Sequence, residues 1–345
     1  MMGVPRSRSL LVTFDAFETL FSPRRPVHIQ YAQVAREFGV HVDPEGVRES
    51  FGPAYRGLCE ELPNYGKASG MTPEKWWKML IIRTFQPLLP HSKRIPRALP
   101  PALITHFASA SAYTLHPIVP ALLHRLRSCP ITPRHPAPTT IGIISNSDPR
   151  VPFIIRDLGV AITHYETSAP RESRAHLQDT PTDAPTSTST SQSSTASPTD
   201  LASKFTELST GRGRTVETRE SASRRSFSAP PGTNGTVDFL TLSYDVGVSK
   251  PDKGIFEAAE KAALDVVGEG ADEEWELVRR RIDEGEMVEM MEKRKRRWTG
   301  RRVHVGDEWR KDVQAAREAG WEGVLWRDDI TLEEMVEKLL GPEEE

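Results

Sequence analysis

Polar side chains that can do chemistry follow three short apolar runs of the chain. Asp15 comes directly after the first run, Ser145 and Asn146 end the second, and Asp307 ends the third. Open α/β sheets carry their ligand-binding groups at the carboxyl ends of their parallel strands. A carboxylate there can act as a nucleophile, and two carboxylates that meet there can hold a hard cation.

These residues also have a simpler interpretation as helix caps. Asp15 and Glu18 form the Asp-x-x-Glu pattern of a capping box, and Asp148, which precedes a proline, could begin a helix. Taken alone, Asp15 is explained better as a cap. A cap needs only one polar side chain, however, so Ser145 and Asn146 remain available at the second strand tip to bind a ligand.

Buried parallel strands are predicted at the three runs because each is short and apolar. The predicted strands and their polar ends span 10–15, 140–146 and 302–307. Helices that join such strands bring all three tips to one edge of the sheet. There Asp15 and Asp307 repel each other unless a cation lies between them, and Mg²⁺ takes carboxylates, a carbonyl oxygen and waters while it holds phosphate. Lys250, kept extended by the proline after it, adds positive charge, so the parts of phosphoryl transfer are present.

The predicted organisation is a core interrupted by insertions. Periodic apolar residues and a tryptophan pair predict a helical subdomain, and a later Ser/Thr/Pro-rich stretch has too little apolar surface to fold. We expect core at 1–21, this helical subdomain at 22–112, core at 113–165, a disordered insert at 166–235, and core at 236–345 with a charged helical insertion at about 269–297.

Composition excludes several classes of protein. The 345 residues carry a formal net charge of −3, which argues against nucleic-acid binding. The chain has only two cysteines, which is typical of a reducing compartment. No apolar run approaches the roughly 20 residues that span a bilayer. We therefore expect an intracellular protein of the cytoplasm, the nucleus or both, with no membrane association. The Ser/Thr-rich insert could attract a protein partner or a kinase.

The order of the motifs resembles the haloacid dehalogenase (HAD) superfamily. The resemblance covers both ends and the middle of the chain, and the stretch from Pro63 to Trp77 further resembles the subgroup named haloacid dehalogenase-like hydrolase domain-containing protein three. It implies an α/β fold with a Rossmann-like core and parallel sheet, and a helical cap inserted after the first motif. The four motifs lie at 14–20, 144–146, 250–251 and 306–307 with Asp312.

This resemblance implies roles in a phosphatase-type reaction on a small phosphorylated metabolite. Asp15 would be the nucleophile that forms an aspartyl-phosphate. Ser145 and Lys250 would hold the phosphoryl oxygens, and Asn146 would contact the substrate. Loop residues of the cap such as Asn64 are guesses for substrate selection, and turn formation explains them more simply.

The same resemblance implies a metal site. Asp15, the backbone carbonyl of Phe17 and Asp307 would bind Mg²⁺. Asp312 would orient Lys250 or a metal-bound water, and Thr19 would support the turn after the nucleophile.

One departure from the superfamily pattern leaves alternatives open. Its phosphatases carry a second Asp, a general acid and base, where this chain has Phe17. Such catalysis is worth about 10²–10⁴-fold, so we expect weakened hydrolysis. An aromatic residue at this position resembles the metal-independent 2-haloacid dehalogenases, although these lack the acid that Asp307 preserves. A third alternative is a catalytically reduced binding protein that keeps the fold.

Overall fold

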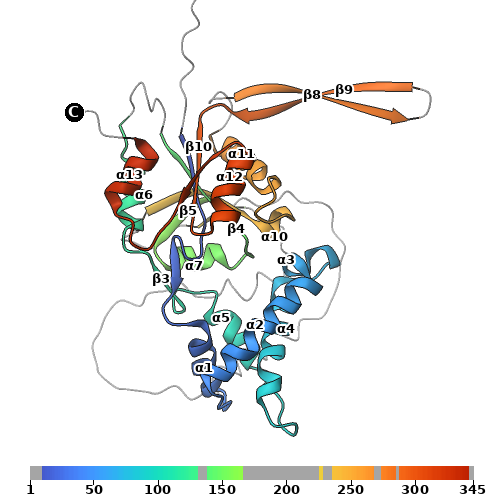
Figure 1. Ribbon diagram of the computed structural model, residues 1–345, viewed down its shortest axis with the longest axis vertical. Coiled ribbons are helices and arrows are strands. Elements are labelled where there is room, and N and C mark those ends of the chain that lie inside the picture. The colour runs from blue at the N-terminus through green and yellow to red at the C-terminus, as the bar shows by residue number, and fades with distance from the viewer. Residues whose placement is uncertain are drawn as a thin grey trace, which may run out of the picture.

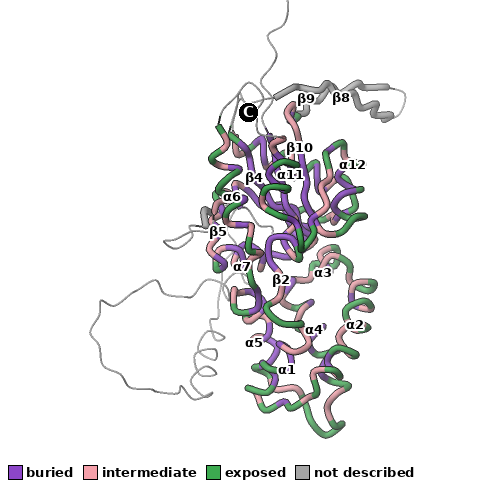
Figure 2. The backbone as a smooth tube through the Cα atoms, turned by 60° about the vertical axis from the view of Figure 1, so that its left-hand side comes forward, coloured by how far each residue is buried: buried purple, intermediate pink, exposed green. Residues whose placement is uncertain are grey.

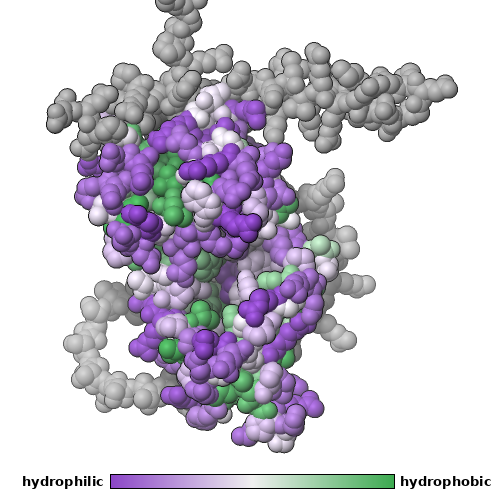
Figure 3. Space-filling view, viewed as in Figure 1, coloured by the Kyte–Doolittle hydropathy of each residue, from purple (hydrophilic) through white to green (hydrophobic). Residues whose placement is uncertain are grey.

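The computed structural model describes residues 10–130, 138–165, 225–227, 235–267, 273–284 and 287–341, with the backbone alone at 225–227, 273–284 and 287–296. Figure 1 shows a sheet with helices on both faces and a separate helical subdomain beside one end of the sheet. Within the described residues, no helix is both long and apolar enough to cross a membrane. On the face drawn in Figure 3, apolar side chains form scattered patches among hydrophilic ones.

The sheet is a seven-stranded one in the order β11-β10-β1-β4-β7-β5-β6. Every neighbouring pair is parallel except β5 and β6, which are antiparallel. This arrangement confirms the predicted α/β class. The strands are β1 (Leu10–Phe14), β4 (Thr140–Ser145), β5 (Val160–Tyr165), β6 (Arg225–Phe227), β7 (Gly235–Leu242), β10 (Arg301–Gly306) and β11 (Glu322–Leu325).

The side chains of β1 show how the sheet is covered on both faces. Leu10, Val12 and Phe14 belong to one hydrophobic cluster, whereas Leu11 belongs to another, because successive strand residues face opposite sides. Figure 2 shows the buried strands between the helices. The first cluster includes α6 (Val119–Arg127), α7 (Val151–Asp157) and α13 (Leu332–Leu340), and the second includes α11 (Gly254–Val267) and α12 (Ala315–Glu318).

The helical subdomain, residues 21–115, is inserted between β1 and β4. A two-stranded antiparallel ribbon of β2 (Phe21–Pro23) and β3 (Tyr113–Leu115) joins it to the sheet. One of its helices begins with a side-chain cap, since the Thr72 side chain accepts the backbone N–H of Lys75 ahead of Pro73. The helices are α1 (Val27–Glu37), α2 (Pro44–Glu61), α3 (Pro63–Gly66), α4 (Pro73–Phe85) and α5 (Leu99–His106).

The prediction of a charged helix at 269–297 is wrong. This stretch forms an antiparallel hairpin of β8 (Glu273–Glu284) and β9 (Met287–Trp298). The register sets acidic positions at the start of β8 opposite basic positions at the end of β9, for example Glu276 opposite Lys295. Cross-strand pairs of opposite charge stabilise a hairpin, and counting helix formers within one segment does not reveal them.

Two further predictions concern the insert and the first turn. Most of the predicted disordered insert at 166–235 lies outside the described residues, but disorder is wrong for 225–227, which form β6 beside β5. The capping interpretation of Asp15 is also wrong. No helix starts there, because Glu18 has a left-handed backbone (φ 56°) and the chain turns into β2.

Candidate functional site

Three carboxylates converge where β1 and β10 end side by side. Asp15, Asp307 and Asp312 each offer an oxygen, and these oxygens all lie within 4.8 Å of one another. The parallel register of β1 with β10 accounts for the first two, because Phe14 pairs with Val305 at the ends of the strands. The structure therefore brings the early and the late acid together, at the edge where the sequence predicted them.

Lys250 lies between two of these carboxylates. Its Nζ is 2.9 Å from Asp15 Oδ1 and 2.6 Å from Asp312 Oδ1, and it donates to the carbonyl of Ile144 at 3.1 Å. Burial opposes the charged form, but the two carboxylates outweigh it and raise the pKa of Lys250. The ammonium group therefore stays protonated.

Asn146 lines the cavity and holds the backbone of Lys250. Its side-chain Nδ2 donates to the Lys250 carbonyl at 2.8 Å, and its Oδ1 accepts the Lys250 N–H at 2.6 Å. These two bonds show that Asn146 positions the lysine. Its contact with the substrate stays a prediction.

Three other predicted residues lie around the carboxylates. The Thr19 hydroxyl donates to Asp307 Oδ1 at 3.3 Å, so Thr19 helps to position the late acid. Ser145 and Phe17 line the same cavity as Asp15. The Phe17 ring packs edge-on against Phe21 at 4.8 Å between centroids.

A buried chain behind the site was missed in the sequence. Thr13 Oγ1 lies 2.9 Å from His304 Nδ1, and His304 Nε2 lies 3.3 Å from Asp312 Oδ1. Burial lowers the pKa of His304, so the ring is neutral, and its Nε2–H donates to the carboxylate while Nδ1 accepts from Thr13. Asp312 keeps a depressed pKa despite burial, because His304 and Lys250 both bind its charged form. Polar residues at matched positions of two otherwise apolar strands were the available signal.

The charges of the site fit a divalent cation. Asp15, Asp307 and Asp312 face one ammonium group, which leaves two negative charges uncompensated. The repulsion is visible at Asp307, whose pKa is raised first by burial and then by the charge of Asp15. Carboxylate oxygens are the ligands that Mg²⁺ prefers. Asp312 already accepts hydrogen bonds from Lys250, from His304 and, at 2.9 Å, from the Glu308 N–H. These bonds suit Asp312 to positioning its neighbours rather than to binding the cation directly.

A cavity of about 510 Å³ is lined by Asp15 and extends to residues of the helical subdomain. Direct contacts join its two walls. Asn64 Nδ2 donates to the Ser243 carbonyl at 2.8 Å and Ser243 Oγ donates to Asn64 Oδ1 at 3.0 Å, while Tyr65 OH donates to the Asn146 carbonyl at 3.4 Å. Asn64 and Tyr65 have left-handed backbones, so both turn formation and contact with the core explain this loop.

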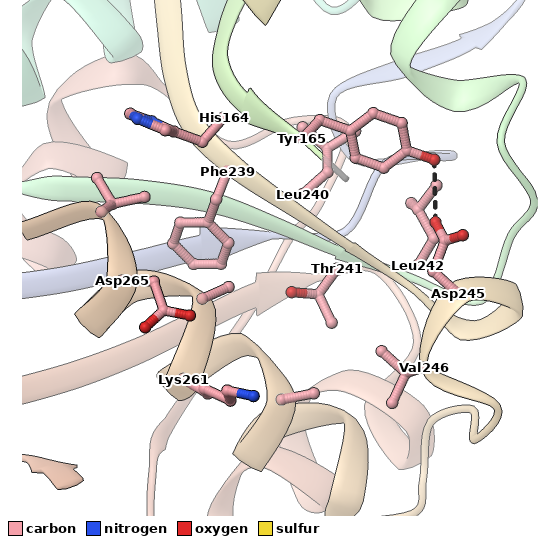
Figure 4. Close-up of a pocket in the computed structure, with 13 residues that line it drawn as sticks. His164, Tyr165, Phe239, Leu240, Thr241, Leu242, Asp245, Val246, Lys261 and Asp265 are labelled. Carbon is pink, nitrogen blue, oxygen red and sulfur yellow. Dashed lines mark hydrogen bonds between the residues drawn. The ribbon is translucent and has the colours of Figure 1, made fainter. Parts of the chain in front are cut away.

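A second cavity, of about 400 Å³, lies among β5, β7 and α11. Figure 4 shows its lining, with the Tyr165 hydroxyl bonded to Asp245. None of the carboxylates of the first site lines it. The chemistry predicted from the motifs therefore belongs to the first cavity alone.

Gly306 allows Asp312 to approach the site, and an alanine there is expected to displace it. A Cβ at Gly306 would lie 2.3 Å from Asp312 Cγ, too close for any real contact. We expect Gly306→Ala to lower the free energy of unfolding by about 1–3 kcal/mol. Denaturant unfolding measures this loss. The matched control is Gly57→Ala in α2, where a Cβ meets nothing within 4 Å, so it should be neutral or stabilising by up to about 1 kcal/mol. Equal effects of both variants would contradict the packing argument.

Comparison with known proteins finds similarity to HAD-like hydrolases over parts of the chain. The family model described as HAD-hydrolase-like matches residues 247–344. An uncharacterized protein of Saccharomyces cerevisiae is 32% identical over 179 residues, which cover 50% of this chain and 56% of that protein. Haloacid dehalogenase-like hydrolase domain-containing protein 3 of Mus musculus is 41% identical over 81 residues, 24% of this chain and 32% of that protein.

Among solved structures, the putative HAD-hydrolase YfnB of Bacillus subtilis is similar with a TM-score of 0.46 and 10% identity, over 96% of this chain and 99% of that one. The matches to the curated relatives are shorter, since the aligned part of this chain spans little more than half of the yeast protein's length. The family match and the named relatives confirm the resemblance carried by the motifs: this chain is similar to HAD-like hydrolases.

Proposed function

We propose that the chain hydrolyses phosphate monoesters in a Mg²⁺-dependent reaction through an aspartyl-phosphate on Asp15. The observation that carries this proposal is the pairing of Asp15 with Lys250 at 2.9 Å beside the carboxylate of Asp307. A nucleophile that lines the cavity then has a buried cation and two further carboxylates beside it. Phosphoryl transfer needs mainly positioning and charge neutralisation, which such a site supplies.

The reaction takes place in two steps at Asp15. A carboxylate oxygen attacks phosphorus, the bond from phosphorus to the ester oxygen breaks, and the alcohol leaves after it takes a proton from water. A second water then attacks the phosphorus, releases inorganic phosphate and restores the carboxylate. Lys250 and Ser145 hold the phosphoryl oxygens, and Asn146 and Asp312 keep Lys250 in place.

Asp15, the Phe17 carbonyl and Asp307 are the groups that would hold Mg²⁺. When bound, the ion supplies positive charge that offsets the charge of the phosphoryl oxygens. Asp312 and Thr19 support this set through the hydrogen bonds described above.

Phosphate release from an aryl phosphate tests this function. Purified full chain is assayed with phenyl phosphate in Mg²⁺ and in chelator. Release in Mg²⁺ alone supports the proposal. The rival, a metal-independent dehalogenase, is favoured only by the aromatic Phe17 beside the nucleophile, and it predicts halide release from 2-chloropropionate in chelator. If the chain shows neither activity, the remaining alternative is a binding protein that keeps the fold.

The leaving group is expected to control the rate, because Phe17 cannot donate a proton. Its ring is packed against Phe21 and Tyr113, at the position of the acid that typically contributes about 10²–10⁴-fold. We expect kcat/KM for phenyl phosphate to exceed that for an alkyl phosphate by about 10²-fold or more. Equal values for the two esters would show that another group protonates the leaving oxygen.

A further inference from the structure

Arg150 lies in the wall of the same cavity, and nothing in the proposed reaction uses it. Its side chain is only 11% exposed. Nε lies 3.0 Å from Asp148 Oδ1 and Nη2 lies 2.9 Å from Asp148 Oδ2, while the guanidinium carbon sits 4.0 Å above the Trp77 ring. Asp148 also accepts the Trp77 indole N–H at 2.6 Å. The guanidinium is therefore fixed on two sides by residues of the core and of the helical subdomain.

One edge of the Arg150 guanidinium makes no hydrogen bond to the described residues. Nη1 has no hydrogen-bond partner in the described part of the chain, although Arg150 lines the cavity. Asp148 already balances the charge of Arg150, so the pair is neutral as a unit. The remaining N–H groups suit an acceptor of a single negative charge better than a doubly charged phosphate.

Two buried tyrosines add donors at the same place. Tyr31 and Tyr113 are 3% and 5% exposed, both line the cavity, and neither hydroxyl bonds to any other described residue. Burial raises the pKa of Tyr113 to about 12 and that of Tyr31 still further, while the charge of Arg150 acts in the opposite direction on both. Both hydroxyls are thus protonated, within electrostatic reach of Arg150, and free to donate.

A row of aromatic rings connects these donors with the nucleophile. Phe17 stands two residues after Asp15, and its ring lies 5.7 Å from that of Tyr113. Tyr113 lies 6.2 Å from Phe107, and Phe107 lies 5.1 Å from Tyr31. These rings line the cavity together with Asp15, so an aryl leaving group in the cavity can pack against them. The residue that replaces the general acid is thereby the start of an aromatic wall.

We propose that the cavity selects aryl phosphates whose ring carries a carboxylate, which binds Arg150, Tyr31 and Tyr113 while the ring lies along the aromatic wall. The phosphate half of this inference rests on the proposed function, whereas the carboxylate half does not. A cavity of about 510 Å³ is large enough for such a molecule. A planar carboxylate accepts hydrogen bonds from the guanidinium edge and from both hydroxyls, and such charge-assisted bonds are the strong ones.

A matched pair of substrates tests the carboxylate. We compare kcat/KM for 4-carboxyphenyl phosphate with that for 4-carbamoylphenyl phosphate, in which an uncharged amide of nearly the same shape replaces the carboxylate. The wild-type chain should prefer the carboxylate by about tenfold or more. Tyr31→Phe and Tyr113→Phe each remove one hydroxyl and should cut this preference several-fold, and the double variant should bring the ratio near one. Tyr165→Phe, which loses a buried hydroxyl beside the second cavity (Figure 4), is the control and should keep the wild-type ratio.

Binding of the products separates this inference from the proposed function. Quenching of tryptophan fluorescence reports 4-hydroxybenzoate and 4-hydroxybenzamide, because Trp76 and Trp77 line the cavity. Tighter binding of the benzoate, weakened in the two tyrosine variants, supports the subsite even if neither ester is hydrolysed. Equal binding of the two products, or a preference that survives the double variant, overturns the subsite even if phosphate is released.

Discussion

Replacement of Asp15 by asparagine is expected to abolish phosphate release from phenyl phosphate. The amide has nearly the shape of the carboxylate but cannot form the aspartyl-phosphate, so only binding and electrostatic effects remain. Loss of a covalent nucleophile of this kind costs roughly 10⁴-fold or more in kcat. Released phosphate, measured at saturating ester in Mg²⁺, gives the comparison.

Asp157→Asn is the control for this experiment. Asp157 pairs with Arg156 at 2.8 Å in a partly exposed position at the end of α7, and surface pairs contribute little to stability. Its variant should keep wild-type turnover. Activity of Asp15→Asn within tenfold of the wild type would remove the nucleophile from Asp15 and with it the proposed reaction.

Replacement of Lys250 by methionine is expected to produce the largest loss of stability. Lys250 is 3% exposed and pairs with both Asp15 and Asp312, so its removal leaves two carboxylates crowded without a compensating charge. Breaking a buried pair in this way costs about 3–5 kcal/mol. Denaturant unfolding in chelator measures the free energy, and phosphate release should fall in parallel because Lys250 holds the phosphoryl oxygens.

Two further variants show whether the cause is the buried charge. Lys253→Met changes an exposed lysine three residues away and should leave the unfolding free energy unchanged. The double variant Lys250→Met with Asp312→Asn removes one of the stranded charges. Its loss should be smaller than the sum of the two single losses by about 1 kcal/mol or more. Additive losses would contradict the direct pairing of the two residues.

The parts of the fold that depend on local sequence could be predicted. β1, β4 and β10 are short apolar runs, so their burial follows from their composition. The proximity of Asp15 and Asp307 could also be predicted, because the carboxyl ends of parallel strands lie at one edge of the sheet whatever the order of the strands. The closing helix begins with a capping box of Thr331 and Glu334, which is a local pattern as well.

The rest depends on partners far away in the chain. The hairpin of β8 and β9 depends on pairing between two charged segments, and the composition of each segment alone favours a helix. The bonds of Asn146 to the Lys250 backbone could not be predicted because they join positions 104 residues apart. Arg150 escaped notice for the same reason, since Trp77, which helps to fix it, comes from the helical subdomain. Local patterns predict on which element a polar side chain lies, but not which distant residue it contacts.

The measurement that tests the account most directly is a Mg²⁺ titration of thermal and denaturant stability, made on the full chain and on Asp307→Asn. An ion that binds only the folded chain stabilises it by about 2.7 kcal/mol at one hundred times its dissociation constant. We predict that the wild-type chain gains this stability with increasing Mg²⁺, whereas Asp307→Asn starts no less stable in chelator and gains little. No gain for the wild-type chain, or an equal gain for Asp307→Asn, would contradict a shared metal site of Asp15 and Asp307.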